Sequence, residues 1–350
     1  MMEKRNAVIL GASGLVGQRF CQMLSNHPFF NITGLFGGST SDGKRLVDVL
    51  KIPEHSISDP ELLQKRIDHL DVDAISKLDP DIVFSALPND LAREIEMELA
   101  SLNFKVFTNA SANRMMESVP LVVPEVNHEC LETVRGKHGF IVANGNCSSI
   151  GLALSLKPVM KFGISEVNVT TFQAASGAGY PGVPSLDIMD NLVPYISQEE
   201  EKISQEIPKM FGTYESGHIR NSEIKVFPTC VRVPVRDSHL EVVQATLGQD
   251  VEEYEVLESF RNFRSLPQEM KLPSAPENPV ILRSEENRPQ PSLDSMAGSS
   301  ERSRGMSATV GRVKLSDSRL RYVTLSHNTI RGAAGGSVLN AELMFKMGWI

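Results

Sequence analysis

Three glycines near the start of the chain, Gly11, Gly14 and Gly17, constrain the fold more than any other feature. They follow a short apolar run, residues 7–10, and precede residues 15–24, whose apolar side chains recur at helical spacing. A strand, a glycine turn and a helix in this order let the backbone approach a pyrophosphate at the helix N-terminus. The opening therefore predicts a dinucleotide-binding unit.

Further strands and helices alternate after this opening. Residues 31–37, 81–89 and 105–111 contain short apolar runs typical of buried strands, and residues 90–103 have a helical pattern between the last two. Alternating strands and helices favour a parallel, doubly wound sheet. The first part of the chain is thus predicted to be a Rossmann-type α/β domain, with such a fold that binds no nucleotide as the alternative.

The pattern changes in the second half of the chain. Longer alternating runs predict a mixed or antiparallel sheet, and hence an α+β domain. Its strands are expected within residues 166–176, 225–237, 240–248 and 307–316. The residues between the last two, 262–305, are rich in Pro, Ser and charge and are expected to form extended surface loops.

The end of the chain, residues 328–349, reads as a Gly/Ala turn followed by an amphipathic helix. Small residues in the turn would let this helix pack closely back on the first domain. We therefore place the first domain at residues 1–146, completed by about residues 330–350, and the second domain at residues 147–329.

Composition excludes several classes of protein. A net charge of −8 argues against nucleic acid or an anionic membrane surface as the main partner. The four cysteines, Cys21, Cys130, Cys147 and Cys230, are far apart and predict neither a metal site nor a disulfide framework. A reducing cytoplasm suits them best. The sequence also starts without a signal-peptide pattern and has no apolar run of membrane-spanning length.

Cys147 stands between a Gly/Asn turn, residues 144–146, and an apolar helix predicted to begin beside it. Free N–H groups of the first helical turn would face the sulfur and favour the thiolate, lowering the cysteine pKa from about 8.5 toward neutrality. The same donors would hold an oxyanion. This environment suits a nucleophile, and the alternative is a packed, inert thiol.

The loop after the second predicted strand bears on the choice of cofactor. It contains Ser39, Thr40, Ser41 and Lys44, and it lacks the acidic residue that binds the 2′-hydroxyl of NAD. Hydroxyl groups and a lysine would accept a 2′-phosphate. The loop therefore favours NADP over NAD, and NAD is kept as the alternative.

Nine motifs occur in one order along nearly the whole chain: GASGLVGQRF, VFSALPND, NASANRM, VPLVVPEVN, NGNCSS, QAASGAGYPGVPSLDIMDN, EEEK, RVPVRDSH and LSHNTIRGAAG. With these the chain resembles the aspartate-β-semialdehyde dehydrogenases, in particular their archaeal and fungal-type branch. The resemblance implies an NADP-binding Rossmann domain joined to an α+β catalytic and dimerisation domain, in a homodimer or homotetramer. It implies reductive dephosphorylation of L-aspartyl-4-phosphate to L-aspartate 4-semialdehyde, in lysine, threonine and methionine biosynthesis.

The resemblance also implies roles for charged and nucleophilic residues. Cys147 matches the nucleophile that forms a thioacyl intermediate, and His239 matches the acid/base group. Arg232 matches the clamp on the substrate carboxylate, for which the planar guanidinium is well suited. Glu199 and Lys202 match residues for the substrate amino group and the phosphate, although the neighbouring glutamates leave their register ambiguous.

Further residues are assigned by the same resemblance. Arg114 matches a phosphate-binding arginine, Gln173 a substrate contact, and Asn146 a residue that orients the acyl oxygen; both amides could instead satisfy turns. Asn328 matches the partner of the nicotinamide carboxamide. The expected cofactor contacts are Gly11, Ser13, Gly14, Leu15, Val16, Gly17, Ser39, Thr40, Ser41, Lys44, Ser85, Leu87, Pro88, Ser176, Gly177 and Asn328.

Two points stay open at the level of sequence. Arg232 and His239 are seven residues apart in one strand-like run, so they share a face only if the chain bends near Pro234. The alternatives in function are malonyl-CoA reductase, whose substrate has no amino group, N-acetyl-glutamyl-phosphate reductase, whose motifs fit less well, and a non-catalytic nucleotide-binding module. The last would need neither Cys147 nor His239.

Overall fold

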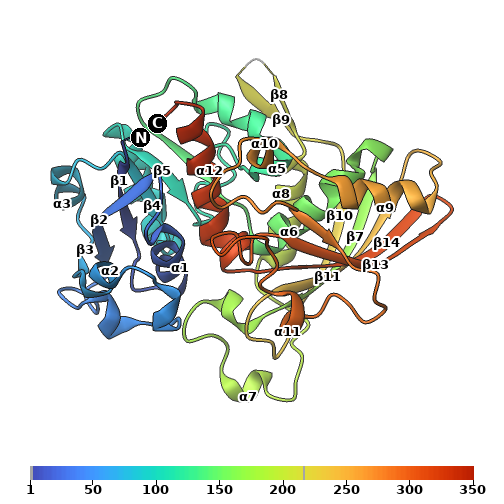
Figure 1. Ribbon diagram of the computed structural model, residues 1–350, viewed down its shortest axis with the longest axis horizontal. Helices are drawn as coiled ribbons and strands as arrows, with labels where there is room; N and C mark the ends of the chain where they lie inside the picture. The colour runs from blue at the N-terminus through green and yellow to red at the C-terminus, as the bar shows by residue number, and fades with distance from the viewer. Residues whose placement is uncertain (1–2, 216) are drawn as a thin grey trace.

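A parallel six-stranded sheet forms the N-terminal part of the computed structural model, which describes residues 3–215 and 217–350 (Figure 1). Its strand order is β3-β2-β1-β4-β5-β6, so the glycine turn after the central strand β1 lies where the order reverses. The strands are β1 (Arg5–Leu10), β2 (Phe30–Gly37), β3 (Asp68–His69), β4 (Ile82–Ser85), β5 (Lys105–Thr108) and β6 (Phe140–Ala143). This sheet confirms the predicted Rossmann-type fold class; β6 is a strand that the sequence analysis missed.

Helices cover both faces of the first sheet because its central strand is apolar on both sides. In β1, Val8 and Leu10 belong to one apolar core, and Ala7 and Ile9 belong to the other. Helices α3 and α4 contribute to the first core, and α1 and α12 contribute to the second. The helices of this part are α1 (Leu15–Leu24), α2 (Pro60–Gln64), α3 (Val72–Lys77), α4 (Asn89–Ser101), α5 (Pro124–Asn127) and α12 (Gly335–Lys346).

The C-terminal helix α12 contacts α1 and β5, as the prediction of close packing on the first domain requires. The prediction that it is amphipathic is wrong, because its residues from Gly335 to Phe345 are all buried. The carboxylate of its Glu342 finds partners inside the protein instead of water. Glu342 accepts a hydrogen bond from Ser274 and pairs with His27 at 2.9 Å, so the helix needs no polar face.

The second sheet is mixed and has the order β10-β7-β11-β14-β13-β12. Helices α6, α8 and α9 pack on it, with α6 crossing β11 and β14. The strands are β7 (Glu166–Gln173), β10 (Lys225–Arg232), β11 (His239–Thr246), β12 (Val280–Leu282), β13 (Ala308–Ser316) and β14 (Arg319–Ser326). The helices are α6 (Cys147–Leu156), α8 (Glu199–Met210) and α9 (Glu253–Asn262), and β8 (Thr213–Glu215) pairs with β9 (His218–Arg220). The predicted α+β class is confirmed; β12 and β14 were not foreseen.

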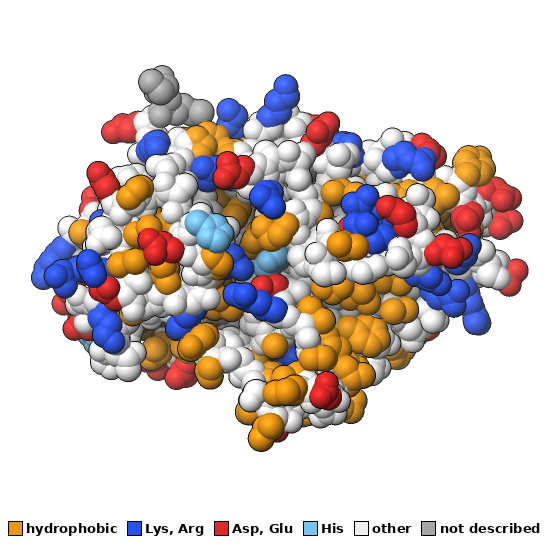
Figure 2. Space-filling model, turned by 60° about the horizontal axis from the view of Figure 1, so that its bottom comes forward, with side chains coloured by type: hydrophobic (Ala, Val, Ile, Leu, Met, Phe, Trp, Pro, Cys, Tyr) orange, Lys and Arg blue, Asp and Glu red, His pale blue; other side chains and the backbone are white. Residues whose placement is uncertain are grey.

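The other face of this sheet leaves apolar side chains in solvent. Phe227 on β10 is 52% exposed, and the neighbouring arm with the short helix α7 (Ser185–Ile188) carries Leu186 at 87% and Met189 at 60% exposure. Figure 2 shows hydrophobic side chains gathered on one side of the molecule. Among the residues that the structure describes, no helix is long and apolar enough to cross a membrane.

Residues 262–305 are more ordered than the predicted surface loops. They include α10 (Leu266–Glu269), β12 and α11 (Pro291–Asp294), and they bury the Asp294 carboxylate. Arg302 donates hydrogen bonds to the backbone carbonyls of Met23 and Ser25 at the end of α1. Such long-range contacts leave no local sequence pattern. The composition of residues 262–305 therefore suggested surface loops, although hydrogen bonds connect this segment to the first domain.

Candidate active site

The glycine turn between β1 and α1 is shaped by close backbone contacts. Gly11 has a φ of +75°, and a Cβ at this position would lie 2.5 Å from the carbonyl oxygen of Ala86. A Cβ at Gly17 would overlap the carbonyl oxygen of Gly11. The turn therefore requires glycine and leaves its backbone bare where α1 begins. A pyrophosphate fits such a cradle, because the helix N-terminus favours an anion.

The loop after β2 has the exposed hydroxyl groups and lysine that the sequence predicted. Ser39, Thr40 and Lys44 are exposed, whereas Ser41 is buried and its hydroxyl donates to the carbonyl oxygen of Gly38 at 3.0 Å. Three of the four predicted groups are therefore free to meet a 2′-phosphate, and Ser41 shapes the loop.

Two residues at the cofactor side differ from the prediction. The hydroxyl of Ser85 is buried and donates to the Glu96 carboxylate at 2.7 Å, so it faces the protein interior and not the cleft. Lys51 was missed; its ammonium donates to the carbonyl oxygen of Ser13 at 2.7 Å and so lies beside the glycine turn. It comes from a loop distant in sequence and carries no motif of its own.

A cleft of about 380 Å³ is lined by several of the predicted cofactor and substrate residues, although Gln173, Arg232 and His239 are not among its lining residues. It is bordered by the ends of β4 and β5, by the start of α6 and α8, and by the residues after β7 and β14. The predicted residues that line it are Leu15, Val16, Leu87, Pro88, Arg114, Asn146, Cys147, Ser176, Gly177, Glu199, Lys202 and Asn328.

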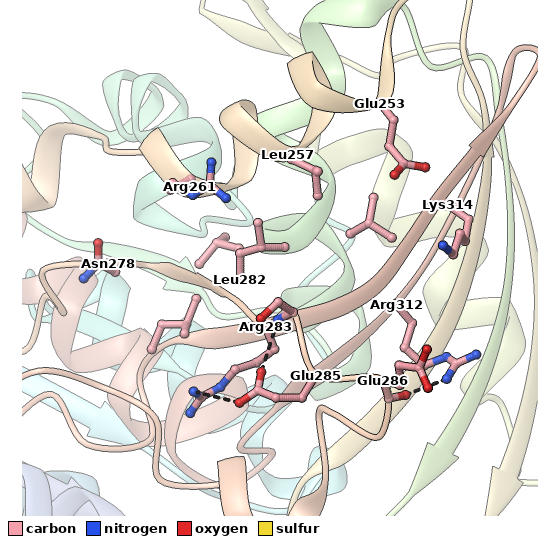
Figure 3. A pocket seen from close by; sticks show the side chains of 14 residues that line it. Glu253, Leu257, Arg261, Asn278, Leu282, Arg283, Glu285, Glu286, Arg312 and Lys314 are labelled. Atoms are coloured by element: carbon pink, nitrogen blue, oxygen red, sulfur yellow. Dashed lines mark hydrogen bonds and ion pairs between the residues drawn. The ribbon is translucent and has the colours of Figure 1, made fainter.

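A larger groove of about 700 Å³ lies elsewhere, between α9 and strands β12 and β13. Figure 3 shows its charged rim, where Arg283 pairs with Glu285. None of the residues predicted for the site lines it. The larger volume of this groove therefore does not make it the better candidate for the active site, because Cys147 and other predicted site residues line the smaller cleft.

Cys147 is the first residue of α6, and its sulfur lies 3.1 Å from Nε2 of His239. Asn146 caps the helix: its side-chain oxygen accepts the N–H groups of Ser148 at 2.9 Å and Ser149 at 3.3 Å. The Ser148 N–H also acts on the sulfur. The predicted turn, helix start and cysteine are present, and the cap engages the N–H groups of Ser148 and Ser149.

Burial controls the protonation of this pair. It raises the pKa of the Cys147 thiol to about 12, with Glu199 adding to the rise and Arg232 opposing it. Burial also lowers the pKa of His239 to about 3, and the positive charge of Arg232 acts in the same direction. The predicted fall of the cysteine pKa is thus wrong, because desolvation outweighs the effect of the helix end.

Arg232, Gln173 and His239 form a row across three adjacent strands. Arg232 at the end of β10 is paired with Gln173 at the end of β7. On the other side of β7, β11 begins at His239, one position beyond the pair of Leu240 with Phe172. The expected single run is thus two strands joined by a turn, which resolves the odd spacing of Arg232 and His239.

The carboxylate of Glu199 contacts three other residues on the substrate side of the cleft. One carboxylate oxygen accepts hydrogen bonds from the side-chain amides of Asn146 at 2.8 Å and Gln173 at 3.3 Å. The other oxygen lies 3.2 Å from the ammonium of Lys202. Because α8 begins at Glu199, the first turn of the helix faces the cleft. Glu199 and Lys202 line the cleft, whereas the neighbouring Glu200 and Glu201 are not among its lining residues.

Glu206 was missed by the sequence analysis. It accepts a hydrogen bond from Arg114 at 2.6 Å and another from the backbone N–H of Asn146 at 2.7 Å, so it ties the predicted phosphate residue to the nucleophile turn. Lys209, one helical turn further, donates to the carbonyl oxygen of Arg114 at 2.9 Å. The spacing 199, 202, 206, 209 follows one helix face and could have revealed both.

A kinked turn, Ile330–Ala334, in which Ala333 has non-helical backbone angles, lies against the nucleophile. A Cβ added at Gly332 would lie 2.7 Å from Cβ of Cys147. Just before this turn, the Asn328 amide donates to the Ser176 hydroxyl at 2.8 Å, at the rim of the cleft. The C-terminal segment therefore forms one wall of the site, as its motif indicated.

Two regions of the chain match models of known domains. Residues 6–134 match the semialdehyde dehydrogenase NAD binding domain, and residues 156–331 match the semialdehyde dehydrogenase dimerisation domain. Together these matches cover most of both halves of the molecule.

Individual proteins resemble the chain over its full length. The aspartate-semialdehyde dehydrogenase of Archaeoglobus fulgidus is 46% identical over 346 residues, which is 97% of each chain. The malonyl CoA reductase (NADP) of Metallosphaera sedula is 37% identical, covering 100% of this chain and 99% of that protein. The structure of aspartate semialdehyde dehydrogenase with NADP from Candida albicans has a TM-score of 0.87 at 34% identity and covers 99% of this chain and all of its own. The chain therefore belongs to the aspartate-semialdehyde dehydrogenase family, in the branch with archaeal and fungal members.

Proposed function

We infer that the protein catalyses NADPH-dependent reductive dephosphorylation of L-aspartyl-4-phosphate to L-aspartate 4-semialdehyde. The carrying observation is the cleft itself, where the Cys147 sulfur faces His239 at 3.1 Å beside Glu199 and Lys202. A carboxylate and an ammonium next to the nucleophile suit a substrate that carries an amino group and a phosphate. The family relatives that bear the name aspartate-semialdehyde dehydrogenase support this choice.

The cofactor site fits a dinucleotide. The bare glycine turn would hold the pyrophosphate, and Ser39, Thr40 and Lys44 would meet the 2′-phosphate of NADP. Bound NADPH would supply the hydride that reduces the thioester carbon. Asn328 and Ser176, joined by their hydrogen bond at the rim of the cleft, would position the nicotinamide end.

The protein's own residues would divide the remaining work. The Cys147 sulfur attacks the acyl carbon; a C–S bond forms and the C–O bond to phosphate breaks. Arg232 would hold the substrate carboxylate with its planar fork, and Glu199 would hold the ammonium group. Lys202 and Arg114 would take the phosphate. His239 lies where a proton or hydrogen bond at the sulfur is needed.

The discriminating experiment compares two substrate pairs. NADP reduction is measured with aspartate semialdehyde plus phosphate, and with malonate semialdehyde plus coenzyme A. We expect turnover with the first pair, lost in Cys147→Ala and Cys147→Ser. Turnover with the second pair alone would overturn the proposal in favour of malonyl-CoA reductase, and turnover with neither would favour a binding module.

We infer further that the chain assembles as a homodimer or homotetramer in the cytoplasm. We also propose that each chain has two domains, one formed by residues 1–146 together with about residues 330–350, and the other by residues 147–329. The apolar residues on the open face of the second sheet and on the α7 arm, such as Phe227 and Leu186, support an interface there. Phe227→Lys should shift sedimentation toward a smaller species. Leu78→Lys, at an exposed apolar residue of the first domain, is the control and should not.

A further inference from the structure

The segment that carries Arg114 has little regular structure of its own. Residues 111–119 follow β5 and form turns instead of a helix or strand. These turns close through single backbone hydrogen bonds, such as the one from the Met116 N–H to the carbonyl oxygen of Asn113 at 3.1 Å. Arg114 lines the cleft from this segment. Its position therefore depends on contacts that the rest of the protein supplies.

Lys209 of α8 supplies three such contacts from one side chain. Its ammonium donates to the backbone carbonyl oxygens of Arg114 at 2.9 Å, Met116 at 2.9 Å and Val119 at 3.0 Å. An ammonium group has three N–H donors and no acceptor, so the three carbonyl groups match its donors in number. Lys209 is only 5% exposed. The cation therefore lies inside the turn segment and not in solvent.

We propose that Lys209 is a positioning residue of the phosphate site, and that its positive charge holds the Arg114 segment in the form that binds phosphate. The proposal rests on the function proposed above, in which Arg114 takes the phosphate. Lys209 is not among the residues that line the cleft, so it acts through Arg114. Loss of its charge should weaken phosphate binding and leave the chemistry at Cys147 in place.

Helix α8 holds Arg114 at two points. Glu206 pairs with the guanidinium at 2.6 Å, and Lys209, three residues further along the helix, holds the backbone carbonyl group. Glu206 also accepts the backbone N–H of Asn146 at 2.7 Å, beside Cys147. The helix thus connects the phosphate segment with the nucleophile turn. A neutral side chain at position 209 would leave three carbonyl groups without their charged donor, which is costly for buried groups.

The groups around the ammonium give it little counter-charge. Cys130 and Glu206 are the groups that act on it against its burial. Burial raises the pKa of Cys130 to about 12, so Cys130 is an uncharged thiol at neutral pH. The Glu206 carboxylate already pairs with Arg114. Glu96 of α4 acts on Arg114, and burial raises the pKa of its carboxyl group. The carbonyl groups are thus the main partners of the cation.

The protonation of Lys209 should make phosphate binding depend on pH. Burial lowers the pKa of Lys209 to about 8. Below this pH the side chain is charged and has three donors, whereas above it the amine keeps two donors for three carbonyl groups. Phosphate affinity should therefore fall as the pH rises through about 8. By linkage, bound phosphate should favour the protonated form of Lys209.

The test is the Kd of inorganic phosphate, measured by isothermal titration calorimetry between about pH 7 and 9.5. Lys209→Arg keeps its charge over this range and so corrects for the ionisation of phosphate itself. We expect the wild-type Kd to rise about fivefold relative to that of Lys209→Arg. Lys209→Met is similar in length but uncharged, and should bind about tenfold more weakly than wild type at about pH 7. The exposed Lys161→Met is the control and should follow wild type.

Steady-state kinetics separates positioning from a general structural role. Folded Lys209→Met should raise the KM of phosphate about tenfold and change kcat and the Kd of NADP by less than about threefold. Equal phosphate affinity in wild type and Lys209→Met would overturn the proposal. A wild-type Kd that does not rise above about pH 8 would overturn it without any variant. If phosphate binds as described but aspartate semialdehyde is not turned over, the proposed function fails and the role of Lys209 stands.

Discussion

Gly332→Ala tests whether the kinked turn Ile330–Ala334 holds the nucleophile in place. An added Cβ would lie 2.7 Å from Cβ of Cys147 and 2.9 Å from its Cα. Because non-bonded carbon atoms prefer about 3.5–4.0 Å, the turn and the start of α6 must separate by roughly 1 Å. A displacement of this size at a reacting atom costs about 100-fold in rate, and overpacking costs about 1–3 kcal/mol of stability.

The assay is NADP reduction with aspartate semialdehyde and phosphate, together with the rate of Cys147 alkylation by iodoacetamide. We expect kcat to fall about 100-fold while the Kd of NADP changes by less than about threefold. Gly34→Ala on β2 is the control for overpacking, because the atoms nearest to its Cβ would be side-chain atoms of Leu78, Phe36 and Val8 and not atoms of Cys147. A folded Gly332→Ala enzyme with kcat within about twofold of wild type would refute the reasoning.

Three further predictions concern the nucleophile, a buried ion pair and acid stability. Cys147→Ala should abolish turnover and leave the Kd of NADP, measured by fluorescence titration, within about threefold of wild type, since the sulfur supplies chemistry and not dinucleotide binding; residual turnover would remove its role. Glu125→Gln breaks the buried bidentate pair with Arg331, whose two hydrogen bonds measure 2.9 and 2.6 Å, and should cost about 3–5 kcal/mol in urea unfolding; a loss below about 1 kcal/mol would contradict this. Burial lowers the pKa of His239 to about 3 and that of His327 to about 4, whereas both titrate near 6.5 when unfolded. Because the unfolded chain binds these protons first, the free energy of unfolding should fall below about pH 6.5 by up to about 1.4 kcal/mol per pH unit for each histidine; equal values at about pH 7 and about pH 5.5 would argue against buried neutral rings.

Sequence patterns were sufficient wherever neighbours along the chain decide the structure. The strand, glycine turn and helix at Gly11, the helix start at Cys147 and the alternation of β7 all depend on local periodicity and turn chemistry. The family motifs added His239 and Lys202 to the predicted site residues. Lys202 lines the cleft, and His239 contacts Cys147, which also lines it. Two strands were missed: β6 has only four residues, whereas β14 was overlooked although its first residues alternate between exposed and buried.

The sequence by itself indicated the two fold classes and the dinucleotide turn, because these follow from residue spacing over a few turns. The family motifs, and not residue spacing, pointed to Cys147 as the nucleophile. Only the tertiary structure decided what surrounds the nucleophile. Strand order places Arg232, Gln173 and His239 in one row, and the packing of α8 brings Glu206 to the turn before Cys147. Burial then sets the direction of the pKa shifts of Cys147 and His239, and the backbone N–H of Ala174, just beyond the end of β7, donates to Nδ1 of His239. Desolvation and hydrogen bonding across 60 or more residues of chain have no signature in local sequence, since they exist only once distant segments meet.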